Sequence, residues 1–141
     1  MTMMKNNISE NIKELKEKAD GLSVLYVEDE DTLREKTSNL FKKIFPTVDV
    51  AKDGKEGLDR YKQKKYDIVV TDILMPNMDG FTLIKNILKD NDDQEIIISS
   101  AYNEEQYLDK AAELGISSYI YKPVKLNELV DVLNTSIEKI S

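Results

Sequence analysis

The sequence predicts an α/β domain built on a doubly wound, five-stranded parallel sheet, and three observations support this prediction. Short, mostly apolar runs recur along the chain, as is typical of buried parallel strands. Segments with apolar residues at helical spacing separate these runs. Three of the runs end on charged residues, where open α/β sheets place their ligands. The expected strands are residues 22–27, 48–51, 67–71, 95–99 and 118–121.

Helices are expected after each of these strands. The apolar spacing predicts them over residues 31–45, 55–65, 81–89, 104–114 and 126–140. Pro46 is expected to end the first helix, and Asp53-Gly54 to turn the chain into the second. Gly115 follows the fourth helix, in a position that glycine favours. Strands and helices that alternate imply right-handed crossovers, and the expected sheet order is 2-1-3-4-5, the flavodoxin-like arrangement.

An extra helix is expected before the first strand. In residues 8–19 the apolar positions are spaced by 4, 3 and 4 residues, which indicates an amphipathic helix that is too short to establish a coiled coil. We therefore expect residues 1–21 to form an N-terminal amphipathic helical extension and residues 22–141 to form one domain. The helix is expected to pack on that domain or to fray in solvent. A role in dimerisation or as a linker is the alternative.

The composition fits a soluble globular protein and excludes several classes. The chain has 141 residues, of which 40% are hydrophobic and 33% charged. It lacks an apolar stretch of roughly 20 residues and a secretory signal, so we expect a cytoplasmic protein without a membrane partner. The net charge is −7, and direct nucleic-acid binding is not expected. Because cysteine and histidine are absent, any metal ion must be a hard cation held by oxygen.

Four charged residues follow three of the expected strands: Glu28 and Asp29, Asp72, and Lys122. The carboxyl ends of parallel strands meet at one edge of the sheet, so these side chains should converge. Two like charges about 4 Å apart repel by about 4 kcal/mol at an effective dielectric constant of about 20, so the acids require a cation such as Mg²⁺. Lys122 can pair with Asp72 at rest and with a phosphoryl oxygen later. The pattern favours in-line phosphoryl transfer with Asp72 as the nucleophile.

Taken in order, these residues resemble the receiver (phosphoacceptor) domain of bacterial two-component response regulators, the CheY-like family. The resemblance runs from about Leu22 to Ile140. It rests on four segments: Val24-Leu25-Tyr26-Val27-Glu28-Asp29-Glu30, Asp72-Ile73-Leu74-Met75-Pro76 with Asp79-Gly80, Ser100-Ala101, and Tyr119-Ile120-Tyr121-Lys122-Pro123.

The resemblance implies a signalling domain that is not a conventional enzyme. Asp72 would accept phosphate from the phosphohistidine of a sensor histidine kinase or a histidine phosphotransfer protein, in a self-catalysed reaction. Asp29, Asp72 and the backbone carbonyl of Leu74 would bind Mg²⁺, with Mn²⁺ as a substitute. Glu28 would join directly or through a water, and Ser100 and Lys122 would contact the phosphate. Relatives often have a cis Lys-Pro bond, and the sequence does not decide whether Lys122-Pro123 is cis.

Two departures from the family pattern concern the metal and the phosphate. The acidic pair is Glu28-Asp29 where Asp-Asp is commoner, which shifts the first carboxylate by one methylene. Ser100 replaces the more frequent threonine and loses the stiffness of a β-branched side chain, so a less sharply two-state response is expected.

The resemblance also implies how a signal leaves the site. Tyr119 would turn inward when Ser100 moves toward the phosphate, changing the face made by residues 104–114, 118–121 and 126–140. This face would meet a downstream protein target or a fused effector. A homodimer through the same face or through the N-terminal helix is a further expectation. Leu74 and Tyr102 would flank the phosphate without orienting a water, so slow intrinsic loss of phosphate is expected.

Other functions remain as alternatives at this stage. A Mg²⁺-dependent phosphatase with Asp72 as its nucleophile would resemble Asp-x-Asp, and Leu74 stands at the second acid. A pseudo-receiver would only dock partners. A dinucleotide site is not expected because no Gly-x-Gly-x-x-Gly follows the first strand. The last helix reaches the end of the sequence, so we expect no effector domain in it, and the chain is either a stand-alone regulator or an excised receiver.

Overall fold

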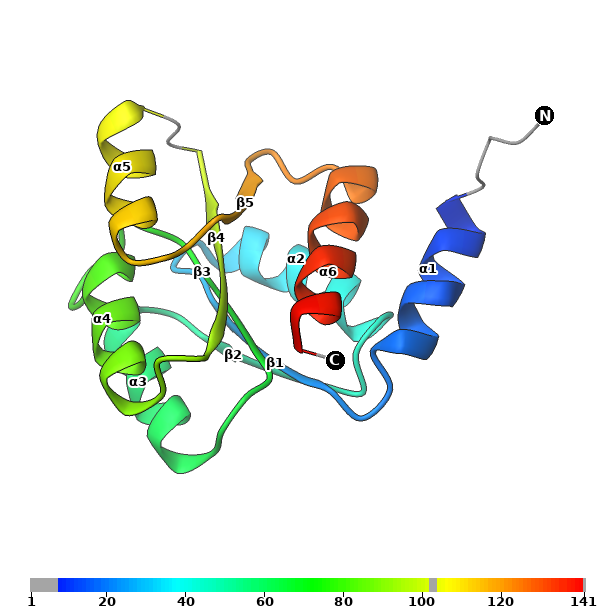
Figure 1. Ribbon diagram of the computed structural model, residues 1–141, viewed down its shortest axis with the longest axis horizontal. Helices are drawn as coiled ribbons and strands as arrows, with labels where there is room; N and C mark the ends of the chain where they lie inside the picture. The colour runs from blue at the N-terminus through cyan, green and yellow to red at the C-terminus, as the bar shows by residue number, and fades with distance from the viewer. Residues whose placement is uncertain (1–7, 102–103, 141) are drawn as a thin grey trace.

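Five parallel strands form one sheet in the computed structural model, which describes residues 8–101 and 104–140 (Figure 1). The strands are β1 (Ser23–Val27), β2 (Thr47–Ala51), β3 (Ile68–Thr71), β4 (Glu95–Ser100) and β5 (Ser118–Tyr121). The helices are α1 (Ile8–Lys18), α2 (Asp31–Lys42), α3 (Gly54–Gln63), α4 (Gly80–Asp90), α5 (Glu105–Glu113) and α6 (Leu126–Ile140).

The sheet order is β2-β1-β3-β4-β5, which confirms the predicted flavodoxin-like fold. The last residue of β1, Val27, is level with Ala51 of β2 and with Thr71 of β3. The hydrogen bonding continues one residue further, from Glu28 N to the Ala51 carbonyl at 3.0 Å and from Asp72 N to the Val27 carbonyl at 3.1 Å. Two acidic residues therefore leave neighbouring strands at the same height, where the strand order reverses.

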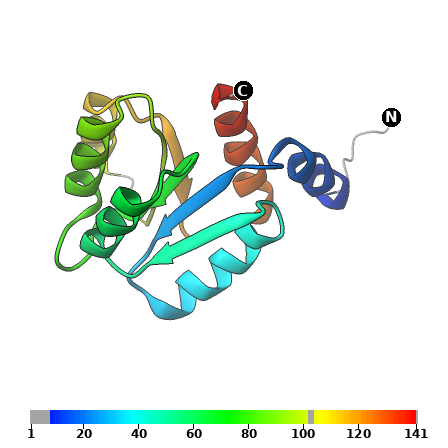
Figure 2. The same ribbon diagram turned by 90° about the horizontal axis from the view of Figure 1, so that it is seen from below.

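Helices cover both faces of the sheet (Figures 1 and 2). Alternate residues of β1 supply the two cores, because successive strand side chains point to opposite faces. Leu25 and Val27 belong to the core that includes residues of α3, α4 and α5. Val24 and Tyr26 belong to the core that includes residues of α2 and α6. Burial on both faces explains why the strands are continuous apolar runs.

The helix α1 packs on α6 outside the alternating part of the chain (Figure 1). Leu15 and Ala19 are buried in the same core as the apolar residues of α2 and α6. Lys18 Nζ donates a hydrogen bond of 3.1 Å to Asn134 Oδ1. Ile8, at the start of the helix, is 37% exposed. The apolar spacing of this segment therefore reflects packing against the chain's own core.

Several predicted boundaries were wrong by one to three residues. The helix expected to reach residue 45 ends at Lys42, and Pro46 does not end it. Residues 43–45 instead close turns through backbone bonds to the carbonyls of Leu40 and Phe41, which lets Ile44 and Phe45 enter the core. α4 begins at Gly80 because the Asp79 carboxylate caps it, accepting a 2.8 Å bond from Thr82 N.

Substituting Leu15 with alanine should lower the free energy of unfolding by about 2–4 kcal/mol, because its side chain is fully buried. Ile8→Ala is the matched control on the same helix, and its exposed side chain predicts a loss below about 1 kcal/mol. Urea denaturation followed by circular dichroism would measure both losses. Equal losses would show that α1 does not pack on α6 in solution.

Substituting Asp53 with alanine should lower the free energy of unfolding by about 1–2 kcal/mol near pH 7. The Asp53 carboxylate caps α3 by accepting from Glu56 N at 2.8 Å, and it also accepts from Asn77 Nδ2 at 2.8 Å. The bond from Glu56 N, more than any other contact, lowers the pKa of Asp53 from its ordinary 3.8.

A lowered pKa gives this prediction its pH dependence. The contribution of the Asp53 charge is present above pH 3.8 and is lost as the pH falls through the folded-state pKa. The difference in the free energy of unfolding between wild type and Asp53→Ala, measured by denaturation, should therefore become smaller as the pH falls below 3.8. The exposed Asp92 serves as the control, and Asp92→Ala should change stability by less than about 0.5 kcal/mol. A gap that widened in acid would contradict the assignment.

Candidate functional site

Three carboxylates lie together at the carboxyl edge of the sheet. Glu28 and Asp29 directly follow β1, and Asp72 directly follows β3. One oxygen from each of the three lies within 4.8 Å of the others. Glu28 and Asp72 are buried, whereas Asp29 is exposed to solvent. The structure therefore brings together the acidic residues that the sequence singles out.

Lys122, which directly follows β5, bridges the two buried acids. Its Nζ donates to Glu28 Oε1 at 2.6 Å and to Asp72 Oδ2 at 2.9 Å. Burial alone would lower the pKa of Lys122, but these two bonds outweigh burial and leave the pKa raised. The lysine is thus held as an ammonium ion. One ammonium ion does not balance three carboxylates, so the cluster keeps excess negative charge.

Glu28 is fixed by bonds at both of its carboxylate oxygens. Oε1 accepts a hydrogen bond from Lys122 Nζ, and Oε2 accepts one from Glu30 N at 3.1 Å. Burial raises the pKa of Glu28 above its usual range, although the bonds from Lys122 and Glu30 oppose that rise. Arg34 holds the same turn, because its Nη1 donates to the Glu28 carbonyl at 2.9 Å and its Nη2 to Asp31 Oδ1 at 2.7 Å.

Asp29 and Asp31 both stand at the start of the helix that follows β1, where an aspartate can act as a helix cap. The N-cap of α2 is Glu30, which makes no side-chain capping bond. Asp31 lies in the first turn and pairs with Arg34 instead. Asp29 is therefore not engaged as a cap, and its carboxylate lies beside the other two acids.

Asp72 is held from two directions. Its Oδ1 accepts a hydrogen bond from Ile73 N at 2.7 Å, and its Oδ2 accepts one from Lys122 Nζ at 2.9 Å. The Thr71 hydroxyl donates to the Asp72 carbonyl at 2.9 Å. These bonds place the Asp72 carboxylate at the edge of the cluster with only 7% of the residue exposed. Each carboxylate oxygen of Asp72 therefore has a defined hydrogen-bond partner, which fixes the orientation of the group.

The loop after β3 folds back tightly over Asp72, and glycine makes this possible. Gly80 N donates to the Ile73 carbonyl at 2.6 Å. A Cβ at Gly80 would collide with the Asp72 carbonyl, and one at Gly54 would collide with the Met78 carbonyl. Any larger residue at either glycine would push the loop away from the site. Leu74 lies on this loop with 45% of its surface exposed.

Ser100 and Tyr119 lie on the neighbouring strands. Ser100 is fully buried at the end of β4, and its carbonyl accepts from Lys122 N at 3.0 Å. Tyr119 is half-buried on β5 and packs against the core of α3, α4 and α5. The Lys122–Pro123 peptide bond, which the sequence left undecided, is cis. Tyr102, predicted to influence phosphate lifetime, falls outside the described residues.

Some residues that shape the site carry little signal in the sequence. The Ile73 and Glu30 amides act through the backbone, which no side-chain pattern reveals. Arg34 reads as an ordinary charged helix residue. The two glycines do carry a readable signal, since Asp53-Gly54 and Asp79-Gly80 are both Asp-Gly pairs, which mark tight turns. Together these contacts make a rigid acidic site that suits a hard cation with oxygen ligands.

Known proteins resemble this chain in both sequence and fold. Residues 24–134 match the family described as the response regulator receiver domain. The chain is 33% identical over 115 residues to the chemotaxis protein CheY of Thermotoga maritima, covering 81% of this chain and 96% of the relative.

Solved structures agree with the sequence comparison. The N-terminal domain of an uncharacterized Wolinella succinogenes protein superposes with a TM-score of 0.78 and 32% identity, covering 84% of this chain and 95% of that one. A chain of the CheX-CheY-BeF3-Mg²⁺ complex from Borrelia burgdorferi has a TM-score of 0.73 and 31% identity, covering 81% of this chain and 87% of that one. With the acidic cluster at the switch point of the sheet, these matches show that the chain belongs to the response regulator receiver domain family.

Proposed function

We propose that this chain is a Mg²⁺-dependent phosphoacceptor switch in which Asp72 receives the phosphoryl group. The donor would be the phosphohistidine of a sensor histidine kinase or of a histidine phosphotransfer protein. One observation carries the proposal: three carboxylates lie within 4.8 Å of one another, and Lys122 bridges the two buried ones. Burying carboxylates in this way costs free energy unless a cation or hydrogen bonds compensate their charge.

The residues present fit a magnesium ion. Asp29, Asp72 and the carbonyl of Leu74 would hold it, with Glu28 contributing directly or through a water, and Mn²⁺ could substitute. The excess negative charge that Lys122 leaves uncompensated is what a hard divalent cation would balance. When bound, the ion would neutralise charge on the phosphoryl oxygens.

The reaction would be an in-line displacement at phosphorus. An Asp72 carboxylate oxygen forms the new P–O bond, and the P–N bond to the donor histidine breaks with its electron pair on the imidazole. The product on this chain is an acyl phosphate. Lys122 is already bonded to Asp72 Oδ2 and can pass to a phosphoryl oxygen, while the Ser100 hydroxyl supplies a second contact.

The signal would leave through α5, β5 and α6. Ser100 moving toward the phosphate would let Tyr119 turn inward, which alters the surface of these three elements. A downstream protein or a fused effector would bind the altered surface, and a homodimer through it or through α1 is the second form of output. Retention of phosphate at Asp72 is expected to be long, because Leu74 offers no hydrogen bond to an attacking water.

The proposed setting is the cytoplasm, with residues 22–141 as the receiver and residues 1–21 as its extension. Within residues 8–101 and 104–140 no helix is both long enough and apolar enough to span a bilayer. The net charge of −7 argues against direct nucleic-acid binding.

Incubating the protein with Mg²⁺ and acetyl phosphate should add the mass of one phosphoryl group, and peptide mapping should place it on Asp72. Asp72→Asn should abolish the addition because the nucleophile is lost, and chelation of Mg²⁺ should abolish it as well. Asp79→Asn is the control, since it changes a carboxylate of the same loop while keeping a good helix cap. Modification that survives Asp72→Asn would refute the proposal.

Replacing Lys122 with methionine should lower the free energy of unfolding by about 3 kcal/mol without divalent ions, because two buried carboxylates lose their partner. Millimolar Mg²⁺ should recover part of that loss by supplying positive charge at the same place. Lys139→Met is the control, because Lys139 is 44% exposed and lies 3.9 Å from Glu95; it should lose less than about 1 kcal/mol with no dependence on Mg²⁺. A loss at Lys122 that Mg²⁺ does not reduce would argue against metal binding here.

Leu74→Asn should speed loss of the phosphoryl group about fivefold, the effect of one new hydrogen bond of about 1 kcal/mol to the attacking water. The experiment follows decay of the phosphorylated protein after the donor is removed. Leu74→Met keeps an apolar side chain at this exposed position and should decay like wild type. Equal decay of the asparagine and methionine variants would mean that Leu74 does not set the lifetime.

A further inference from the structure

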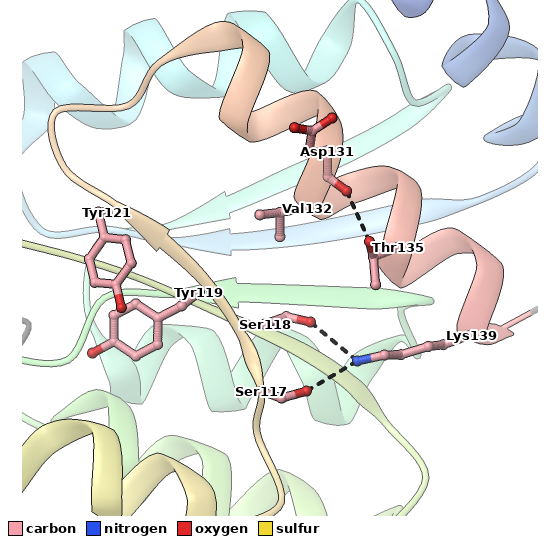
Figure 3. Close-up of a pocket in the computed structure, with 8 residues that line it drawn as sticks. All are labelled: Ser117, Ser118, Tyr119, Tyr121, Asp131, Val132, Thr135 and Lys139. Atoms are coloured by element: carbon pink, nitrogen blue, oxygen red, sulfur yellow. Dashed lines mark hydrogen bonds between the residues drawn. The ribbon is translucent and has the colours of Figure 1, made fainter.

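Two tyrosine rings pair at the outer edge of the sheet. The ring centroids of Tyr119 and Tyr121 are 4.9 Å apart, and the ring planes are tilted by 30°. Both residues line a groove that Asp131 and Lys139 of α6 also line, and Figure 3 shows the two rings on the side of β5 that faces away from α6. Tyr121 is 42% exposed, whereas Tyr119 is half-buried. The outer ring therefore lies against the inner one on the solvent side.

The register of the sheet also places Tyr121 beside Ser100. Tyr121 is the Cα partner of Ser100 across the β4–β5 pair, and Tyr119 is the partner of Ile98. Residues two apart on a strand share a face, and in-register partners of parallel strands point to the same side. Tyr121 thus borders both residues whose movements would be coupled, Ser100 and Tyr119.

The ring of Tyr119 also lies within electrostatic reach of the acidic site. Burial, followed by the neighbouring Tyr121 and then Asp72, raises the pKa of Tyr119 to about 12. A change of charge at Asp72 will therefore act on the environment of this ring. Any inward movement of Tyr119 must also break or carry along its contact with Tyr121.

We infer that Tyr121 is a positioning residue that holds the Tyr119 ring in its half-buried, groove-lining place and so sets the threshold for the switch. The inference rests on the proposed function, in which Tyr119 turns inward when Ser100 moves. An aromatic pair of this kind stabilises one arrangement of the inner ring by a modest amount. The free energy that phosphorylation contributes to the inward state must exceed this stabilisation before the Tyr119 ring moves inward. Removing the Tyr121 ring should therefore make the inward state easier to reach.

The test compares wild type, Tyr121→Leu and Tyr121→Phe in their response to beryllofluoride with Mg²⁺. NMR resonances of the Tyr119 ring report both its position at rest and the midpoint of the beryllofluoride titration. Tyr121→Leu should shift the resting resonances toward the inward state and lower the midpoint about 2- to 10-fold, in proportion to the lost ring contact. Tyr121→Phe keeps the ring and should restore the wild-type midpoint.

A double-mutant comparison separates positioning from general packing. In a Tyr119→Leu background, Tyr121→Leu should no longer change the midpoint, now followed on the Asp72 backbone amide, because no ring remains to be held. Should Tyr121→Leu fail to fold, Tyr121→Met with the same titration replaces it. An unchanged midpoint in Tyr121→Leu, or an equal shift in Tyr121→Phe, would overturn the role of Tyr121 while leaving the switch intact. A wild-type protein that does not respond to beryllofluoride at all would overturn the proposed function and this inference together.

Discussion

The bridge from Lys122 to Glu28 and Asp72 is the interaction on which the site depends. Two carboxylates buried side by side would each lose several kcal/mol of hydration and would repel one another. The ammonium at 2.6 and 2.9 Å makes their burial tolerable. It also leaves the cluster short of positive charge, because the exposed Asp29 adds a third carboxylate. The resting site is therefore stable without being neutral, which suits a place that takes up a cation and a phosphoryl group.

The scaffold makes this bridge possible by keeping the strand ends level. Val27 pairs with both Ala51 and Thr71, so the residues that follow β1 and β3 emerge next to each other. Lys122 follows the edge strand β5, so its side chain must extend past the end of β4 to reach the acids that follow β3 and β1. Ser100, the last residue of β4, is fully buried. A long, flexible side chain is needed for that span, and lysine has one. The same strand carries the two tyrosines, so the cation and the proposed output element share one short segment.

Backbone groups finish the site. The amides of Ile73 and Glu30 each bind a carboxylate oxygen, and they do so because the loops after β3 and β1 turn sharply. The loop after β3 can turn so tightly only because glycine stands at residues 80 and 54, where a Cβ would meet backbone carbonyls. Rigid loops of this kind hold the reacting carboxylate in one orientation, which is how positioning contributes to phosphoryl transfer.

The sequence by itself determined the strand order, the approximate elements and the convergence of the charged residues, because apolar periodicity and the rules of parallel sheets are local and general. It placed the end of α2 too late, since Ile44 and Phe45 continue the apolar pattern although they enter the core from a turn. Only the tertiary structure decided that Lys122 binds Glu28 as well as Asp72, that α1 lies on α6, and that Tyr121 covers Tyr119. These contacts join residues far apart in the chain or depend on side-chain direction, and no pattern within one segment specifies them.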